Sequence, residues 1–290
     1  MKNWLLAIRP KTLPAGIAPV FIGSAMAYGD GGFHALSAIA CLIAALLIQI
    51  GTNLANDYFD FKKGADVNRV GPTRVTQAGL IKPSTVLTAT IIVFALAALI
   101  SLYLIHRGGM AIAIVAVASI VSGVFYTAGK KPLGYLGLGE LFVFIFFGPV
   151  AVAGTYYVQT HDMNWAIVAA GLGPGFLSCA ILAVNNLRDI EGDKKAGKRT
   201  LAVRFGQNFA KSEYLLFILL ATMSPFLVFL ITKDHSGMVA ASVVGFLAIG
   251  TVKTVMTTTD SGVLNSVLAH TGRWLLIYSV LFSFGWILCR

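Results

Sequence analysis

Long apolar runs constrain this chain more than any other feature of its sequence. A transmembrane helix needs about 20 mostly apolar residues, and nine stretches approach that length. They cover 12–29, 35–58, 84–105, 109–127, 136–158, 164–187, 213–232, 237–254 and 272–289. Only 12% of the residues are charged, against about 25% in a soluble globular domain. We therefore predict an all-α polytopic membrane protein with nine transmembrane helices.

The lysines and arginines give this division an orientation. Cytoplasmic loops of membrane proteins carry an excess of both residues. If the N-terminus lies inside, all but three of the 22 fall in cytoplasmic segments, and the exceptions are Arg107, Lys233 and Arg290. We expect an N-in, C-out topology. The basic residues behind the net charge of +10 then mainly set the orientation of the chain in the membrane, and we expect no nucleic-acid partner.

A polar stripe ends the second apolar run. Gln49, Asn53, Asn56, Asp57 and Asp60 recur at intervals that place them on one face of a helix. A charged side chain at the centre of a bilayer costs about 2.5–3.5 kcal/mol even on the lenient insertion scale. This face must therefore point into the bundle or toward a wet cavity. Neighbouring carboxylates suit Mg²⁺, which proteins usually hold through one or two carboxylates plus substrate phosphates.

A second acidic stretch ends the sixth apolar run with the same spacing. Asn185, Asp189 and Asp193 again share one helix face. At an offset of 132 residues, Asn53, Asp57, Lys62 and Lys63 align with Asn185, Asp189, Lys194 and Lys195. We interpret this as a weak parallel repeat of two four-helix halves within one domain, 1–290. A single acidic cluster is typical of an ordinary helix end, whereas two acidic clusters on the same side of the membrane favour a binding site.

Basic residues adjoin both acidic stretches, with Lys62 and Arg74 after the first and Lys130 in the cytoplasmic loop between spans four and five. Carboxylates that hold a metal, ringed by lysine and arginine, can bind a diphosphate. A nucleotide site is not expected, because the sequence has neither a Walker A motif nor a G-x-G-x-x-G turn before a helix.

Six stretches of the chain resemble the UbiA superfamily of intramembrane aromatic prenyltransferases, and in particular its branch that acts on 1,4-dihydroxy-2-naphthoate. The stretches are 9–14 (RPKTLP), 53–58 (NLANDY) with Gly64 and Asp66, 69–74 (RVGPTR), 126–130 (YTAGK), 134–140 (GYLGLGE), and 185–193 (NNLRDIEGD) with Gly197, Lys198 and 200–203 (TLAV). They spread over most of the first seven apolar runs. The last two runs carry no motif.

The resemblance implies a central cavity, open to the cytoplasm and to lipid, in a bacterial plasma membrane. It implies a Mg²⁺-dependent transfer of a polyprenyl group from polyprenyl diphosphate to 1,4-dihydroxy-2-naphthoate. Diphosphate and CO₂ are lost, and demethylmenaquinol forms in menaquinone biosynthesis.

The resemblance also implies roles for single residues. Asp57, Asp60, Asp66, Asp189 and Asp193 are the implied metal ligands, and all of these except Asp66 are implied to be catalytic. Asn53, Lys62, Arg74, Lys130 and Asn185 are the implied diphosphate contacts. Many members of the family place the last aspartate of the first motif four residues after its predecessor, whereas here Asp66 follows Asp60 by six. Whether Asp60, Asp66 or both bind metal therefore stays open.

Other functions remain possible on the sequence alone. A prenyltransferase of another UbiA branch, with 4-hydroxybenzoate or a different acceptor, shares the acidic motifs. A secondary transporter would also have repeats and buried acids, but its site would lie near the midplane. A CDP-alcohol phosphatidyltransferase would need a denser acidic pattern within a single segment.

Overall fold

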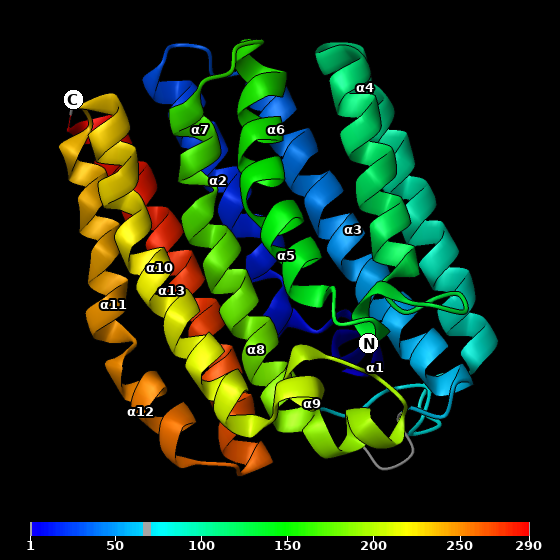
Figure 1. The fold of residues 1–290 in the computed structure, drawn as a ribbon. Coiled ribbons are helices and arrows are strands. Elements are labelled where there is room, and N and C mark those ends of the chain that lie inside the picture. Colours follow the sequence, from blue (N-terminus) through cyan, green and yellow to red (C-terminus); the bar gives the residue numbers. More distant parts are fainter. Residues whose placement is uncertain (1, 66–70, 290) are drawn as a thin grey trace.

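The computed structural model describes residues 2–65 and 71–289. Within these ranges the chain consists of helices and loops, and the predicted all-α membrane fold is confirmed. Most of the long helices stand side by side along one common direction (Figure 1). Asp66 and Arg69 lie outside the described residues.

The first two apolar runs form α2 (Pro14–Gly29) and α3 (Ala35–Lys62). A short helix α1 (Lys2–Ile8) and a 3₁₀ turn η1 (Pro10–Thr12) precede them, and a second 3₁₀ turn η2 (Leu133–Tyr135) lies in the loop before the fifth run. The seventh run forms α10 (Gln207–Thr232) after the short α9 (Leu201–Phe205). The eighth run is assembled from η3 (Ser236–Val243), α11 (Val244–Leu247) and α12 (Ile249–Thr257).

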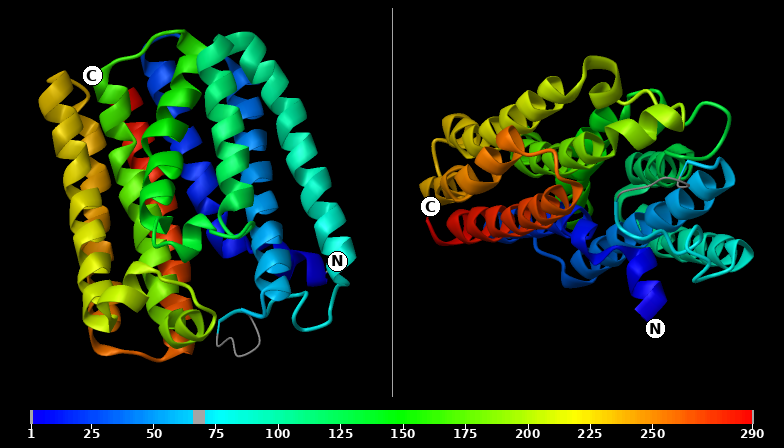
Figure 2. Two further views of the ribbon diagram at one scale, coloured as in Figure 1. Left: turned by 45° about the vertical axis from the view of Figure 1, so that its right-hand side comes forward. Right: turned by 90° about the horizontal axis from the view of Figure 1, so that it is seen from below.

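The third and fourth apolar runs are merged into α4 (Pro83–Phe125), which folds back on itself at Gly109. Gly109 has φ 65° and ψ −153°, a conformation open almost only to glycine. A Cβ at Gly123 would lie 3.4 Å from the Phe94 ring, although 29 residues of straight helix would separate the two by about 43 Å. The two arms of α4 are therefore antiparallel neighbours, as Figure 2 shows.

The fifth and sixth runs are each broken near the middle. The fifth forms α5 (Gly139–Phe147) and α6 (Pro149–Thr160), and the sixth forms α7 (Trp165–Ala170) and α8 (Leu172–Lys195). The two breaks touch, because a Cβ at Gly148 would lie 2.7 Å from the carbonyl oxygen of Gly171. Only glycine permits so close an approach of two backbones.

The last helix begins earlier than the hydropathy pattern predicts. α13 (Ser261–Leu288) starts well before residue 272. The Asp260 carboxylate caps it by accepting a hydrogen bond from the Val263 N–H at 2.8 Å. Polar residues lower the hydropathy of its first turns, although one face of these turns packs inward and includes the buried Leu264. Arg273 therefore lies within this helix rather than at its start, and its place on the cytoplasmic side stays a prediction.

Seven helices of the described chain are long and apolar enough to span a membrane, or eight if α1 with η1 and α2 form one bent span. This number treats α4 as a single helix although its arms are antiparallel. Length and hydropathy alone set the number, so the predicted nine spans and their orientation stay predictions.

The helices form two packed groups. The main core joins α2, α8, α10 and α13 through buried side chains such as Ile22, Leu177, Tyr214 and Tyr278. On the other side, α3 packs against both arms of α4, since Gly51 lies beside Phe94 of the first arm and Thr52 beside Gly123 of the second. Figure 2 shows the two groups on opposite sides of the bundle when it is seen from below, and residues of both groups line the cavity described next.

Candidate active site

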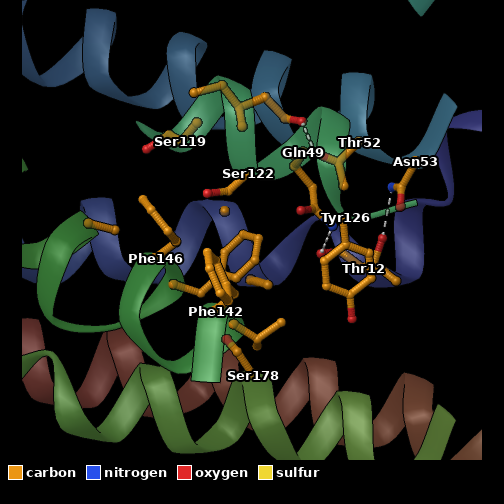
Figure 3. A pocket seen from close by; sticks show the side chains of 18 of the residues that line it. Thr12, Gln49, Thr52, Asn53, Ser119, Ser122, Tyr126, Phe142, Phe146 and Ser178 are labelled. Atoms are coloured by element: carbon orange, nitrogen blue, oxygen red, sulfur yellow. Dashed lines mark hydrogen bonds between the residues drawn. The ribbon is translucent and has the colours of Figure 1, made fainter. Parts of the chain in front are cut away.

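A cavity of about 340 Å³ runs into the bundle between these groups. Its apolar wall includes Val20, Leu104, Ile112 and Val158. Its polar wall lies near the ends of α3 and α8, and includes Asn53, Asn56, Asp60, Arg74, Asn185, Asn186, Asp189, Asp193 and Lys198. The two acidic motifs of the sequence therefore meet at one end of an apolar cavity. Figure 3 shows part of this cavity from close by.

Asp60 lies at the centre of the polar wall, with 1% of its surface exposed. Its Oδ2 is 3.2 Å from Arg74 Nη2 and 3.3 Å from Lys198 Nζ. Its Oδ1 accepts a hydrogen bond from the Tyr135 hydroxyl at 2.9 Å. Burying a carboxylate is costly unless it is paired and hydrogen-bonded, and these three partners meet that requirement.

Lys198 joins the two motifs. Its Nζ is 3.3 Å from Asp60 and also 3.4 Å from Asp193 Oδ1. The ammonium stands 5.1 Å from the centre of the Tyr135 ring, and that of Lys63 stands 4.6 Å from it. Burial lowers the pKa of Lys63, an effect that the nearby Asp60 opposes. Two cations and the Asp60 carboxylate thus contact one tyrosine.

Asp57 has a different environment. It is 1% exposed and does not line the cavity. Its carboxylate accepts hydrogen bonds from the N–H groups of Val75 and Thr76, at 3.2 and 3.0 Å, and from the Thr76 hydroxyl. It therefore anchors the loop that carries Arg74 to α3.

The second motif is organised by Arg188. Its guanidinium donates to both oxygens of Asp189, at 2.8 and 2.6 Å, in a forked geometry. It also donates to Asn185 Oδ1 at 2.7 Å and to Asn265 Oδ1 at 2.7 Å. Asn265 belongs to α13, so this network ties the second motif to the last helix.

Amides of the first motif hold neighbouring segments in place. Asn53 donates to the carbonyl of Ile8 at 2.9 Å and to the Thr12 hydroxyl at 3.1 Å (Figure 3). Asn56 Oδ1 accepts a hydrogen bond from the Thr127 hydroxyl at 2.8 Å. These bonds position the N-terminal segment and the end of α4 around the cavity mouth.

The structure brings together most of the predicted site residues but not all. Asn53, Asp60, Arg74, Asn185, Asp189 and Asp193 line the cavity. Lys62 and Lys130 are exposed and are not part of its wall. Together with Asp57 and Asp66, their predicted roles in binding metal or diphosphate stay predictions.

Residues 16–266 match the model of the UbiA prenyltransferase family. The chain belongs to this family.

Relatives within the UbiA family are similar over most of their length. A 1,4-dihydroxy-2-naphthoate octaprenyltransferase of Mycobacterium tuberculosis is 39% identical over 282 residues, which cover 96% of this chain and 94% of the relative. The protein of the same name from Haemophilus influenzae is 42% identical over 71% of this chain and 70% of its own. A solved UbiA homolog from Archaeoglobus fulgidus bound to GPP and Mg²⁺ has a TM-score of 0.66 at 16% identity, and covers 94% of this chain and 99% of its own.

Several residues of this UbiA site were not assigned to it from the sequence. Lys198 and Tyr135 stand inside the quoted motifs, and Arg188 stands between two predicted ligands, so the motifs held a signal for all three. Asn265 had none, because the last two apolar runs carry no motif.

The donor chemistry of the cavity fits Mg²⁺. Carboxylate oxygens of Asp60, Asp189 and Asp193 line its polar end with amide oxygens beside them, and Mg²⁺ prefers such hard ligands. No group of three or more acidic, histidine or cysteine side chains forms a metal cluster in the described ranges 2–65 and 71–289. A full cluster is not required, since Mg²⁺ commonly takes its other ligands from water and substrate phosphate.

Proposed function

We propose that this protein transfers a polyprenyl group from a polyprenyl diphosphate to 1,4-dihydroxy-2-naphthoate, with loss of diphosphate and CO₂. The product is the demethylmenaquinol of menaquinone biosynthesis. The observation that carries the reaction type is the meeting of both acidic motifs, with their cations, at the polar end of an apolar cavity. The identity of the acceptor is inferred from the names of the relatives.

In this proposal Asp60, Asp189 and Asp193 hold Mg²⁺ at the polar end, and Asn53 and Asn185 supply further oxygens. Bound Mg²⁺ neutralises charge on the diphosphate and so makes it a better leaving group. Arg74 and Lys198 lie beside the same carboxylates and bind the phosphate oxygens that face away from the metal. Asp57 and Arg188 act indirectly: Asp57 positions Arg74, and Arg188 positions Asp189.

The apolar part of the cavity serves the prenyl chain. Loss of diphosphate leaves an allylic cation, which water would destroy and which an electron-rich ring carbon captures. The walls formed by α5 and α6 exclude water from that cation, and the faces of Phe142 and Phe146, which line the cavity, stabilise a cation electrostatically.

We further propose that the polar end faces the cytoplasm of a bacterial cell, because the lysines and arginines concentrate on that side of the predicted topology. The two acidic motifs then belong to two weakly related four-helix halves of one domain. Their approach through Lys198 agrees with such a pseudo-symmetric arrangement.

The test is prenyl transfer by the purified chain in detergent. Farnesyl or a longer prenyl diphosphate is offered with 1,4-dihydroxy-2-naphthoate or 4-hydroxybenzoate, with and without Mg²⁺. We expect a Mg²⁺-dependent product and release of CO₂ from the naphthoate. A product from 4-hydroxybenzoate alone would move the protein to another branch of the family, and no product from either in folded protein would reject the proposal.

A further inference from the structure

One serine on the cavity wall differs from several other helix serines of this protein. Ser178 on α8 lines the cavity with 3% of its surface exposed. Its hydroxyl has no hydrogen-bond partner among the described residues. In contrast, Ser101, Ser224 and Ser279 each donate to a carbonyl of the preceding turn at 2.8 Å, which is how serine hydroxyls are commonly satisfied in membrane helices.

A buried hydroxyl without a partner has lost its hydrogen bonds to water and gained none in their place. A ligand that hydrogen-bonds to Ser178 would recover that loss, because the residue faces the cavity. Ser283 on α13 provides a useful contrast. Its hydroxyl is also buried and without a partner in the described chain, but Ser283 does not line the cavity.

The opposite wall of the cavity also presents hydroxyls. Ser119 and Ser122 lie one turn apart on the second arm of α4, and both line the cavity. Figure 3 shows them on the α4 side of the cavity, with Ser178 on the α8 side. The cavity therefore offers hydrogen-bonding groups from two different helices across one apolar space.

Aromatic rings lie between these two walls. Phe142 and Phe146 of α5 are stacked on each other, with centroids 6.1 Å apart and planes 19° apart, and both line the cavity. Figure 3 shows them between the serines of α4 and Ser178. A flat apolar surface of this kind suits another planar ring, since aromatic pairs prefer offset or edge-to-face contacts.

We propose that Ser178, Ser122 and the Phe142 ring form the subsite for the aromatic acceptor. The inference rests on the proposed function, whose acceptor carries hydroxyls on opposite edges of a planar ring. One hydroxyl bonds Ser178 and the other bonds Ser122, while Phe142 packs against the ring. The ligand class is a planar aromatic diol. Hydrogen-bonding groups on two facing walls favour it over a ring that carries a single hydroxyl.

The position along α8 suits such a role. Ser178 lies seven residues before Asn185, two helical turns or about 10.5 Å deeper in the bundle. Asn186, the next residue along α8 and also on the cavity wall, is held by a 2.8 Å hydrogen bond from its amide to the Glu140 carboxylate. The diol subsite thus lies about two helical turns deeper in the bundle than the polar end of the cavity, on the side toward which the prenyl chain of a bound diphosphate would extend.

The test compares Ser178→Ala and Ser122→Ala with Ser283→Ala in the full chain, using farnesyl diphosphate and 1,4-dihydroxy-2-naphthoate. Loss of a neutral hydrogen bond worth about 0.5–1.5 kcal/mol predicts a rise of about 2- to 12-fold in the KM for the naphthoate. We expect the KM for the diphosphate to stay unchanged. Ser283→Ala should match the wild type in both, and thermal unfolding midpoints show whether each variant is folded.

A second measurement uses 1-hydroxy-2-naphthoate, which lacks one hydroxyl, as a competitive inhibitor. The wild type should bind it more weakly than the diol, and one of the two alanine variants should remove that difference. Unchanged affinity for the diol in both variants, or equal weakening of diol and mono-ol in both, would overturn the subsite. A wild type that fails to prenylate the naphthoate would instead overturn the proposed function.

Discussion

The ammonium of Lys198 lies 3.3 Å from the carboxylate of Asp60, although 138 residues separate them in the chain. This contact is the physical link between the two acidic motifs, because Lys198 also approaches Asp193. Lys198 follows the end of α8, and its side chain is 12% exposed. A cation in this position lies between two carboxylates at the cavity mouth.

Replacing this cation should impair diphosphate binding. In Lys198→Gln we expect kcat/KM for the prenyl diphosphate to fall about 10- to 160-fold, the range that a charged hydrogen bond of about 1.5–3 kcal/mol implies. Steady-state kinetics with varied diphosphate measure the effect. Lys195→Gln is the matched control, since Lys195 is exposed at the end of α8. An equal effect in both variants would contradict a specific role for Lys198.

Asp57 should act through the loop that it anchors. In Asp57→Asn one acceptor oxygen becomes an amide that faces N–H donors, and unmatched buried groups cost about 1–3 kcal/mol. We expect faster amide hydrogen exchange at Val75 and Thr76, together with loss of prenyl transfer. Asp189→Asn should also lose activity but should leave exchange at 75–76 unchanged. Loss of activity in Asp57→Asn with normal exchange would favour a direct role in metal binding.

Arg188 should be irreplaceable by lysine. Lysine keeps the charge but cannot make the forked contact with Asp189 while also reaching Asn185 and Asn265. We expect Arg188→Lys to lower kcat/KM by about 10-fold or more, in line with the loss of charge-assisted bonds of about 1.5–3 kcal/mol. Arg199→Lys is the control, because Arg199 is exposed.

Asn265→Ala, which removes one of the four hydrogen bonds that Arg188 donates within the described part of the chain, should have a smaller effect. Activity equal to that of the wild type in Arg188→Lys would show that the network is not needed to position Asp189.

Removal of divalent metal should abolish transfer. We expect EDTA to stop the reaction and added Mg²⁺ to restore it. A thermal shift on joint addition of Mg²⁺ and inorganic diphosphate gives a readout apart from activity, because a ligand stabilises the folded state that binds it. Asp60→Asn and Asp193→Asn should each reduce this shift. Full activity in EDTA would reject the metal site.

The turn in α4 should depend on Gly109. Its φ of 65° with ψ −153° is strained for any other residue, so Gly109→Ala should cost about 1–3 kcal/mol of stability. Gly250→Ala in α12 is the control, since a Cβ there meets nothing within 4 Å. Thermal unfolding in detergent should show a lower midpoint for the first variant and an unchanged or higher one for the second.

Much of this protein is determined by local properties of its sequence. Apolar runs long enough to span a bilayer dictate helices, since a backbone in lipid must satisfy its own hydrogen bonds. The spacing of Asn53, Asp57 and Asp60 places them on one helix face, and burial of that face follows from the cost of charge in lipid. Membership of the UbiA family was likewise visible in the motifs.

The tertiary structure decided what periodicity does not encode. Two aspartates of one motif, Asp57 and Asp60, share a helix face and nearly equal burial, yet only Asp60 lines the cavity. The loop around Thr76 covers Asp57, and a loop's path depends on packing far along the chain. The same holds for Asn265, which reaches Arg188 only because α13 packs beside α8. Local spacing determines which face a side chain occupies, and long-range packing determines what that face meets.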